Sequence, residues 1–573
     1  MKRWVLIAVA LLLLTPPARA QDRSQGRSMV ISRHGVVATE HPLASQAAAM
    51  VLARGGHAVD AAITANAVMG VVAPMWNGIG GDLFAIVYDA TRDELHGLNA
   101  SGWAAAGLTI EVLKSRGVTR ISGIHSVTVP GAVAGWAALR DRFGRKPIGE
   151  LLEAAIGYAE EGVPIAELNA EVWANAAEGV RRDANAARTY LPGGAVPRAG
   201  QLVRFPDLAW SYRQVARDGA DAFYKGEIAR RIVSYSERQG GTMTAADLAE
   251  FRPEWIAPIS TTYRGWTVYE MPPSGQGIAA LAMLNLMEQF PLNDYGHNSA
   301  EALHRMIEAK KLAYADMARH VADPKFATVP VAAMLSKPYA RERARLIDTT
   351  KAACEVPAGR LPTEGGDTIY LSVVDRDGNM VSLIQSVYAS FGSGLVADGT
   401  GFVLHNRGAL FDLNPDHPNA LRGRKRPLHT IIPAFMSRGD VRIAFGIMGG
   451  WNQSQAHAQF VANVVDYGMN IQAALEAARF SKTSFSGCDV RVETRIPEAV
   501  RAELTRRGHE IRMQGDFSGA MGGGQAVMRD FAAGINYGAS DPRKDGAAIP
   551  EPLPGTGAPP VPAPVPGTGA PQR

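Results

Sequence analysis

Residues 28–351 contain alanine-rich segments whose apolar positions follow a helical period. In residues 301–320, apolar side chains recur at spacings of three, four and seven, which predicts a helix that packs on one face. These side chains are Leu303, Met306, Ile307, Tyr314 and Met317. The same reasoning predicts helices at residues 42–54, 57–72, 149–161 and 277–289. The first block of the chain is therefore expected to be mainly helical.

Beyond residue 367 the pattern changes to β-branched and aromatic residues. Residues 368–375 and 380–387 are typical of strands, and the turn-forming sequence Arg-Asp-Gly-Asn lies between them, which predicts a β-hairpin. Consecutive strands favour antiparallel pairing, so we expect a mixed fold of helices and antiparallel sheets. The remaining elements expected in this block are strands at 401–405, 429–436 and 441–447 and helices at 453–467 and 471–480.

A linker and two end segments interrupt these patterns. Residues 349–367 combine prolines and glycines without an apolar run, as in an exposed linker. Residues 1–20 have a basic start, an apolar run and a small-residue motif, which indicates a secretory signal peptide; an uncleaved anchor is the alternative. Residues 550–573 contain nine prolines and a repeated Pro-Gly-Thr-Gly-Ala-Pro, which predicts an extended, disordered tail. We therefore expect an exported protein, periplasmic or secreted.

Composition narrows the classes of function. The chain has 573 residues, of which 46% are hydrophobic and 20% charged, so it can bury a large core. Its 59 basic and 55 acidic residues give a net charge of +4, and three of the basic residues lie in the predicted signal peptide. The remainder is almost neutral, which gives no electrostatic reason to expect nucleic acid as a partner. No apolar run is long enough for a membrane span.

Cysteine and histidine usage argues against metal chemistry. Thirteen histidines form no HExxH motif or similar cluster, and Cys354 and Cys488 are the only cysteines. At most one disulfide can form, and two unpaired thiols are the favoured interpretation. We expect neither a metal nor a cofactor.

The linker leads directly into a strand that begins with threonine. If the bond between Asp367 and Thr368 is cut, Thr368 carries both a hydroxyl nucleophile and a free α-amine. An α-amine with an ordinary pKa of about 7.7 to 8.0 serves as a general base near neutral pH. The pattern by itself is also that of an ordinary strand after a glycine-rich turn.

A series of motifs lies along most of the chain. In order, they are 41–45 (HPLAS), 55–62 (GGHAVDAA), 78–81 (GIGG), 129–135 (VPGAVAG), 271–275 (MPPSG), 367–379 (DTIYLSVVDRDGN), 391–394 (FGSG), 425–428 (KRPL), 466–470 (DYGMN) and 538–543 (GASDPR). Together these motifs resemble the γ-glutamyltranspeptidase family of N-terminal-nucleophile hydrolases. The resemblance implies an α+β fold, a four-layer αββα sandwich formed by two fragments of one precursor. It also implies self-cleavage before Thr368, into a large subunit (21–367) and a small one (368–549, followed by the tail).

The resemblance also assigns catalytic roles. Thr368 matches the nucleophile that forms an acyl-enzyme, and Ser386 matches a hydroxyl residue placed beside it. Gly449 and Gly450 match the pair whose backbone N–H groups face the developing oxyanion. An ordinary strand serine and a tight turn are the alternatives.

The residues that would recognise a γ-glutamyl group differ. Recognition of that group needs a cation for the α-carboxylate and a carboxylate for the α-ammonium. The family arginine falls near Ser101, where there is no basic residue, and the family aspartate aligns with Leu410. Arg407 occupies a neighbouring position that holds an amide or acid in the family. The further differences are His429 and Thr430 in place of paired serines and Tyr388 in place of an asparagine.

These departures predict a γ-glutamyltransferase-like acylase or amidohydrolase that takes another acyl group. Arg407 is a candidate for holding a substrate carboxylate, as in a dicarboxylic monoamide, with a structural arginine as the alternative. The expected partners are a small-molecule amide and the second subunit, and a higher oligomer is possible. A true γ-glutamyltransferase or glutathione hydrolase is the nearer alternative function. An inactive exported binding protein is the distant one.

Several other motifs have simpler interpretations. The basic cluster Arg422 to Arg426 reads as a solvated loop, and Gly522 to Gly524 as a turn near the substrate pocket. His41 and His57 are expected to cap or pack helices. The segment Gly78 to Gly81 lacks the lysine of a phosphate loop, so packing near the site accounts for it equally well.

Overall fold

The predicted hairpin forms the centre of the first sheet in the computed structural model, which describes residues 25–356 and 368–553. Strand β10 (Ile369–Val374) pairs antiparallel with β11 (Met380–Ser386), with Val374 opposite Met380 at the turn. The Asn379 side chain and backbone N–H both donate to the Asp375 carboxylate, which closes the turn. The signal-peptide segment, Asp367 and residues 554–573 lie outside the described residues.

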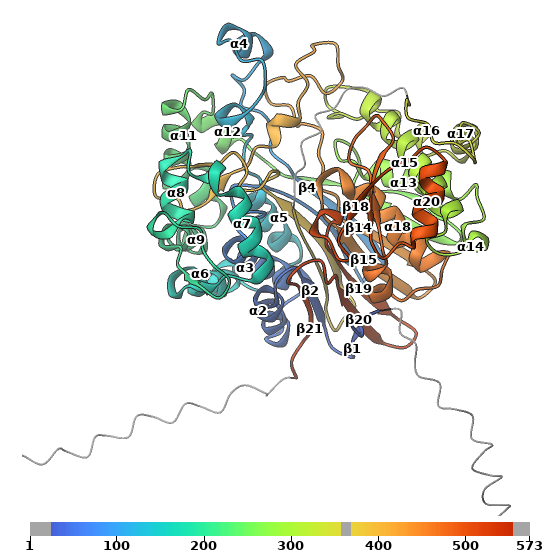
Figure 1. Cartoon of the computed structure of the whole chain (residues 1–573). Coiled ribbons are helices and arrows are strands. Elements are labelled where there is room, and N and C mark those ends of the chain that lie inside the picture. The colour runs from blue at the N-terminus through green and yellow to red at the C-terminus, as the bar shows by residue number, and fades with distance from the viewer. Residues whose placement is uncertain (1–24, 357–367, 554–573) are drawn as a thin grey trace, which may run out of the picture.

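Two seven-stranded sheets, visible edge-on in Figure 1, make up the middle of the fold. The first has the order β21 (Ala547–Pro550), β2 (Val36–Thr39), β10, β11, β3 (Asp82–Asp89), β4 (Glu94–Ala100) and β7 (Glu254–Ile256). The second has the order β1 (Val30–Ser32), β20 (Ile535–Ser540), β19 (Gly524–Asp530), β15 (Val441–Ile447), β14 (Ala434–Arg438), β9 (Trp266–Glu270) and β8 (Ile259–Tyr263). Each sheet contains strands from both sides of Thr368, so neither predicted subunit completes a sheet alone.

An apolar layer joins the two sheets face to face. Phe84 and Ile384 of the first sheet pack in one buried cluster with Phe435 and Val527 of the second. Tyr370 lies against Gly446, where a Cβ atom would come within 2.5 Å of the tyrosine ring. The glycine therefore allows β15 to pack closely on β10.

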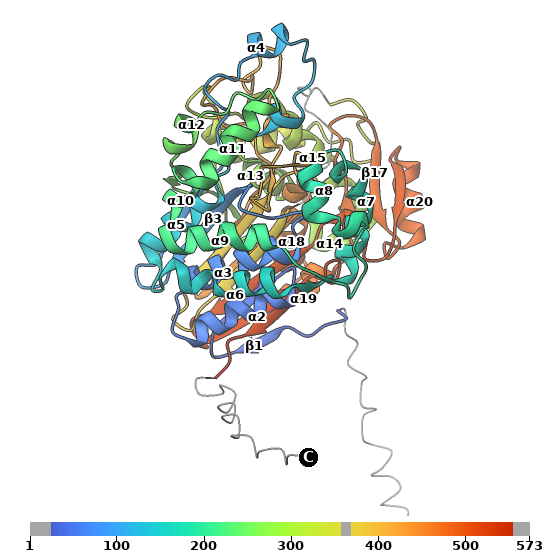
Figure 2. The ribbon, with the colours of Figure 1, turned by 90° about the vertical axis from the view of Figure 1, so that its left-hand side faces the viewer.

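Helices cover the outer face of each sheet, which gives the expected αββα sandwich. Those over the first sheet, in front in Figure 2, are α2 (Pro42–Ala53), α3 (Ala58–Val72), α5 (Ala132–Phe143), α6 (Ile148–Glu161), α7 (Glu167–Val180), α8 (Ala184–Tyr190), α9 (Pro206–Asp218), α10 (Ala220–Tyr224), α11 (Glu227–Arg238) and α12 (Ala245–Ala249). Those over the second are α13 (Gly277–Met287), α14 (Leu292–Tyr295), α15 (Ala300–His320), α16 (Val331–Met334), α17 (Lys337–Ala344), α18 (Gln453–Val465), α19 (Ile471–Glu476) and α20 (Glu498–Arg506). The short helix α4 (Ile110–Ser115) projects from one end.

The smaller elements complete the chain trace. They are the paired strands β5 (Val163–Pro164) and β6 (Leu202–Val203), the pair β12 (Leu395–Val396) and β13 (Val403–Leu404), the three-stranded sheet of β16 (Phe480–Ser481), β17 (Asp489–Glu493) and β18 (Glu510–Gln514), and the 3₁₀ turns Gly123–Ser126, Pro192–Gly194, Arg407–Leu410, Gly450–Asn452 and Gly519–Met521.

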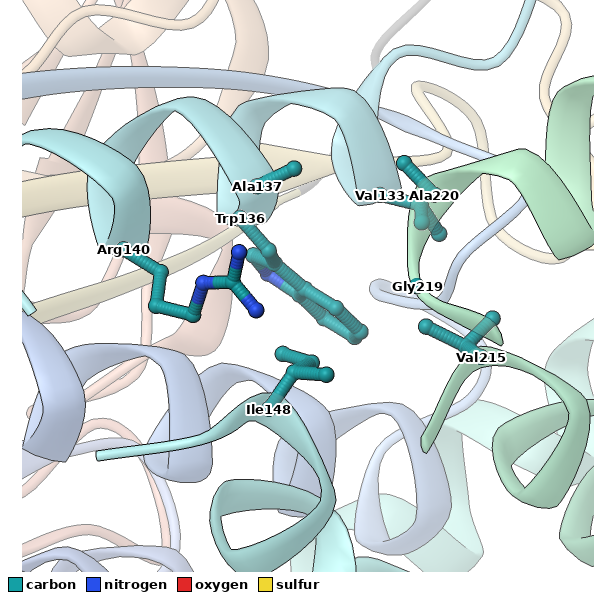
Figure 3. Close-up of a pocket in the computed structure, with 8 residues that line it drawn as sticks. All are labelled: Val133, Trp136, Ala137, Arg140, Ile148, Val215, Gly219 and Ala220. Carbon is teal, nitrogen blue, oxygen red and sulfur yellow. The ribbon is translucent and has the colours of Figure 1, made fainter. Parts of the chain in front are cut away.

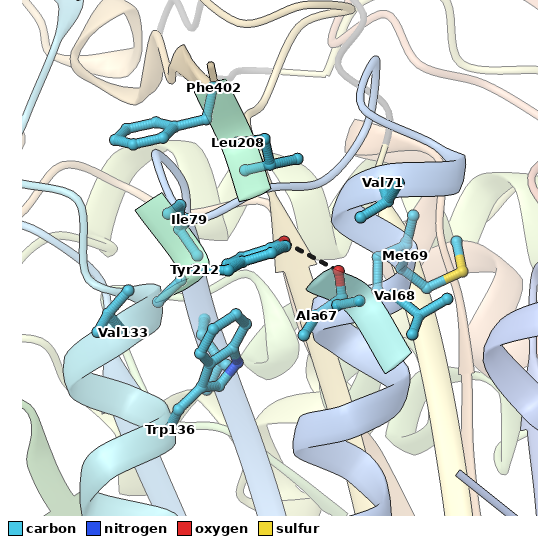
Figure 4. Packing of buried hydrophobic residues seen from close by; sticks show 14 of the residues in the cluster. Ala67, Val68, Met69, Val71, Ile79, Val133, Trp136, Leu208, Tyr212 and Phe402 are labelled. Carbon is cyan, nitrogen blue, oxygen red and sulfur yellow. Dashed lines mark hydrogen bonds between the residues drawn. The ribbon is translucent and has the colours of Figure 1, made fainter. Parts of the chain in front are cut away.

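The helical core confirms the predicted periodicity and shows how alanine allows close packing. All five apolar residues predicted to form the packed face of α15 are buried. Over the first sheet, Trp136 and Tyr212 pack against the alanine-rich helix α3 (Figure 4), and the Tyr212 hydroxyl donates to the Ala67 carbonyl at 2.9 Å. His41 and His57 cap α2 and α3 by accepting backbone N–H bonds, as expected.

Three expectations are wrong. Cys354 and Cys488 form a disulfide rather than remaining as free thiols, because the fold brings residues 134 apart in sequence together. The strand expected at 429–436 begins only at Ala434, since Pro433 cannot donate to a strand ladder. Residue 549 does not end the folded part, because β21 includes Pro550, and the Glu551 carboxylate accepts the Gly35 N–H at 2.8 Å.

The basic cluster at 422–426 is also less exposed than expected. Lys425 and Arg426 are buried, and the Arg426 guanidinium donates to the Ser101 carbonyl and to Glu254. Arg424 contacts Asp247 and Glu250. Arg424 and Arg426 are thus paired with acids and Lys425 donates to the Pro418 and Ala420 carbonyls, whereas Arg422 is exposed as expected. Across the described helices, none combines the length and apolar character that a membrane span requires.

Candidate active site

Thr368 and Ser386 meet at the open end of the hairpin. Thr368 directly precedes β10, Ser386 ends β11, and both are buried. The Thr368 hydroxyl donates to the Ser386 Oγ atom at 3.2 Å, and this oxygen also accepts the Tyr388 N–H at 2.7 Å. The hairpin pairing therefore places a hydroxyl acceptor beside the threonine, as the sequence predicts.

Glycines allow a neighbouring strand to approach this pair closely. A Cβ atom on Gly81 would lie 2.4 Å from the Ser386 carbonyl oxygen, and one on Gly80 would lie 2.1 Å from that of Val403. The segment Gly78 to Gly81 is thus a close-packed turn that leads into β3 beside Ser386.

A glycine turn follows β15 and precedes α18. Gly449 and Gly450 have φ angles of +129° and +57°, which side chains other than glycine rarely adopt. Asn452 donates its N–H to the Gly449 carbonyl at 2.9 Å, and Gln276 donates to the Gly450 carbonyl at 2.8 Å. Gly522 lies against the same turn, where a Cβ atom would come 2.0 Å from the Met448 carbonyl oxygen.

Contacts between the sheets place this turn at the Thr368 end of β10. On β15, the Phe445 carbonyl contacts Ser382, which is paired across the hairpin with Ser372 of β10. The next residue of β15, Gly446, lies against Tyr370 of β10. Moving along β15 toward the glycine turn therefore means moving along β10 toward Thr368. The predicted nucleophile and the predicted oxyanion turn therefore lie at the same edge of the two sheets.

A buried carboxylate, Asp82, organises the other side of the site. Its Oδ2 atom lies 2.9 Å from His429 Nε2, 3.1 Å from His405 Nδ1 and 3.2 Å from Arg407 Nε. Its Oδ1 atom accepts the Gly102 N–H at 2.9 Å. Burial alone raises the pKa of Asp82, but the facing His405 and His429 outweigh that effect and hold the pKa well below its ordinary value.

Arg407 is buried with one edge of its guanidinium held by Asp82. Its Nη1 atom donates to the Thr430 hydroxyl at 2.6 Å, and the guanidinium lies over the Tyr388 ring, 4.6 Å from the ring centre. Its Nη2 atom has no hydrogen-bond partner among the described residues. Tyr388 has a φ angle of +75°, an unusual conformation for a residue with a side chain. The cation is therefore fixed by Asp82, Thr430 and Tyr388, and the two N–H groups of its Nη2 atom are unused.

His429 contributes a neutral donor to this network. Burial, reinforced by the charge of Arg407, lowers the pKa of His429 to about 3. The neutral ring donates from Nε2 to Asp82, and it packs on Phe84 with 4.8 Å between ring centres. The structure thus brings four predicted substrate residues together: Arg407, Tyr388, His429 and Thr430.

Comparison with known proteins identifies the family. The family profile described as gamma-glutamyltranspeptidase matches residues 44–551. The chain belongs to the gamma-glutamyltranspeptidase family. It is 36% identical to the glutathione hydrolase-like YwrD proenzyme of Bacillus subtilis over 91% of this chain and 99% of that protein. It is 35% identical to the oxamate amidohydrolase proenzyme of Klebsiella pneumoniae over 90% of this chain and 98% of that protein.

Solved structures agree with this gamma-glutamyltranspeptidase assignment. The cephalosporin acylase of Bacillus halodurans superposes with a TM-score of 0.86 at 41% identity, covering 94% of this chain and 99% of that one. The protein is thus an enzyme of the N-terminal-threonine hydrolase and acyltransferase class. Because its relatives are proenzymes, the chain is the precursor of a large and a small subunit that act on a small molecule.

Ser101 and Leu410, the two positions predicted to lack the charges of γ-glutamyl recognition, have contacts within the protein. Ser101 is buried, and its hydroxyl donates to Asn99 at 2.7 Å. Its carbonyl accepts from Arg426, whose guanidinium is bound to Glu254, so this cation is already paired. Leu410 is buried in an apolar cluster that also contains Trp451.

Sequence reasoning missed Asp82 and His405. The available signal was an acid at the start of the buried strand Asp-Leu-Phe-Ala-Ile-Val, directly after the glycine segment. A charge in such a position needs a partner, but its partners lie more than 300 residues away along the chain.

One group of possible metal ligands lies elsewhere among the described residues: His304, Glu308 and His509. His304 Nδ1 and His509 Nε2 lie 2.8 Å apart, as in a direct hydrogen bond, and Glu308 binds Lys311 at 2.6 Å. These contacts already use the ligand atoms, so we assign no metal to them.

Two hollows in the helical layer contain none of the site residues. The one in Figure 3, of about 30 Å³, lies beside Trp136 and Arg140 and has room for about one water molecule. A wider cleft of about 440 Å³ lies between α2 and α6. Neither holds a pair of groups suited to acyl transfer.

Proposed function

We propose that the protein is an exported, self-processing amide hydrolase whose nucleophile is Thr368. Cleavage of the bond after Asp367 separates a large subunit (21–367) from a small one that begins at Thr368. The contact between the Thr368 hydroxyl and Ser386 supports this role, because the hairpin presents the hydroxyl in a preformed polar setting. Membership of a family of proenzymes supports the cleavage.

The chemistry uses only groups of the chain. The freed α-amine of Thr368 accepts the hydroxyl proton, and the oxygen attacks the amide carbonyl. The N–H groups of Gly449 and Gly450 stabilise the oxyanion, and the amine leaves with the transferred proton. Ser386 holds the nucleophile in position. Water then hydrolyses the Thr368 ester and releases the acid.

We further propose that the acyl group ends in a carboxylate, which Arg407 binds. The observation that carries this is the unused Nη2 donor of a buried guanidinium whose other contacts are fixed. A buried N–H group without a partner is costly, and a carboxylate matches a guanidinium edge well. Dicarboxylic monoamides have this chemistry, and one relative is named an oxamate amidohydrolase.

The same geometry argues against an α-ammonium in the acyl group. Asp82 is the acid of this network, yet both of its oxygens already accept hydrogen bonds, from Arg407, His429 and the Gly102 N–H. The position of the family aspartate holds Leu410 in an apolar cluster. An ammonium there would remain unpaired, which costs several kcal/mol. A true glutathione hydrolase is therefore the less favoured alternative.

Export is supported by the disulfide between Cys354 and Cys488, since such bonds persist mainly in oxidising compartments. The basic and apolar segment at residues 1–20 is consistent with this location.

Intact mass and substrate profiling test the function. We expect mature fragments that begin near Gln21 and at Thr368. Three anilides should then be compared: a dicarboxylic monoanilide, a neutral acyl anilide of equal length, and the γ-glutamyl anilide. The first should have the highest kcat/KM. A preference for the γ-glutamyl anilide would establish the glutathione hydrolase alternative, and a chain that stays intact would favour an inactive binding protein.

A further inference from the structure

The disulfide spans the bond that the proposed maturation cuts. Cys354 lies before Thr368 and Cys488 lies after it, so the two sulfur atoms belong to different proposed subunits. Resting on the proposed cleavage, we infer that the mature enzyme is a covalent heterodimer whose large and small subunits remain joined through Cys354 and Cys488.

The bond has a different effect before and after the cut. In the precursor it closes a loop between residues 134 apart in sequence, which restricts the unfolded chain. After the cut, that loop no longer exists, and the same bond joins two chains. Separation of the subunits would then need both loss of their packing and reduction of the disulfide.

Backbone contacts hold both cysteines in place within the precursor. The Cys354 carbonyl accepts the Gly487 N–H at 2.8 Å, and the Cys488 carbonyl accepts the Glu510 N–H at 2.8 Å. Ala352 donates its N–H to the Arg507 carbonyl at 2.7 Å. Residues 352–354 therefore run beside the proposed small subunit.

The same segment is anchored to the proposed large subunit through α15. Lys311 donates to the Ala353 carbonyl at 2.8 Å, and the Ala353 N–H donates to Glu308 at 3.2 Å. His304 donates to the Asp348 carbonyl at 2.7 Å. The segment thus forms a clasp between α15 and residues 487–510, with the disulfide as its covalent part.

The clasp leaves the bond open to reductants on one side. Cys488 is buried, but Cys354 is exposed.

Electrophoresis of the full-length protein in denaturant tests the covalent link. Without reductant, the cleaved protein should run as one species, and dithiothreitol should separate it into two. The variant Cys354→Ser/Cys488→Ser should give two species under both conditions. Thiol alkylation of the denatured, unreduced protein should label neither cysteine. Two fragments without reductant, or two labelled thiols, would overturn the proposal.

A second variant separates this result from the proposed self-cleavage. Thr368→Ala combined with a specific protease site within residues 357–367 supplies the cut without the chemistry of the protein. After protease treatment, its fragments should still separate only on reduction. If this variant is linked while the natural chain stays uncut, the self-cleavage proposal fails and the link stands. If its fragments separate without reductant, the link fails.

Discussion

Ser386 and Asp82 lie directly opposite each other in the antiparallel pair of β11 and β3. Directly opposed residues point to the same face of a sheet. Ser386 contacts Thr368, and Asp82 holds Arg407. The register of one strand pair therefore sets the spacing between the proposed nucleophile and the proposed carboxylate receptor.

Replacement of Thr368 should abolish maturation. Thr368→Ala lacks the attacking hydroxyl, so the chain should remain a single precursor without amidase activity, whereas Thr368→Ser should still be cut. Intact mass under reducing conditions distinguishes these outcomes. Ser372→Ala, a matched change in the same buried strand, should mature normally. Maturation of Thr368→Ala would contradict the proposed nucleophile.

Replacement of Arg407 should remove the preference for an acyl carboxylate. A hydrogen bond to a charged group contributes about 1.5 to 3 kcal/mol, so Arg407→Met should lower kcat/KM for the dicarboxylic monoanilide by about 10- to 100-fold. The neutral acyl anilide should change by less than about threefold. Equal losses on both substrates would show a structural arginine instead.

A double substitution separates stability from specificity. Arg407→Met leaves the buried Asp82 without its arginine, and breaking such a pair costs about 3 to 5 kcal/mol. Adding Asp82→Asn removes the unpaired charge and should recover much of the urea midpoint. It should not restore the preference for the carboxylate. Recovery of that preference would mean that Arg407 is not the receptor.

Distortion of the glycine turn should slow catalysis. Gly449 has a φ of +129°, and a Cβ atom there would lie 3.2 Å from the Asn452 Cβ, so Gly449→Ala should move the proposed oxyanion donors. Loss of one such donor costs about 100-fold or more in kcat, and we expect a fall of at least tenfold. Gly439→Ala also introduces a Cβ atom at a positive φ, +52°, but with open space around it and far from the turn in sequence. Kinetics of this control should stay within twofold of the wild type.

Stability should fall in mild acid because of buried neutral histidines. Burial, reinforced by Arg479, lowers the pKa of His457 to about 3 from its ordinary 6.5. Between these values the unfolded chain binds a proton that the folded protein does not. This contribution to stability is therefore complete above pH 6.5 and is lost as the pH falls toward 3.

The variant His457→Gln tests that contribution. One such histidine makes the free energy of unfolding fall by about 1.4 kcal/mol for each pH unit below its ordinary pKa. Between pH 6 and pH 4 the free energy of unfolding of the variant should therefore fall less steeply, by about that amount per pH unit. Urea unfolding at a series of pH values measures the slope. Between pH 7 and pH 8 the two proteins should give parallel curves. Parallel curves throughout would contradict the lowered pKa.

Local pattern was sufficient for the elements that hold Thr368. The hairpin follows from β-branched strands around a turn sequence, so the contact between Thr368 and Ser386 was predictable across 18 residues. The buried face of α15 followed from its period. The apolar run before Ala434 does not extend the strand, because Pro433 has no N–H to donate to the ladder.

The sequence by itself determined the family and the hairpin, because these depend on residue types at short range or in ordered motifs. The tertiary structure alone decided that Asp82 holds Arg407, and that Cys354 pairs with Cys488. Both contacts join segments more than 130 residues apart, and their geometry depends on how the two sheets pack. A buried charge must find its partner wherever the fold places one, and sequence spacing does not carry that information.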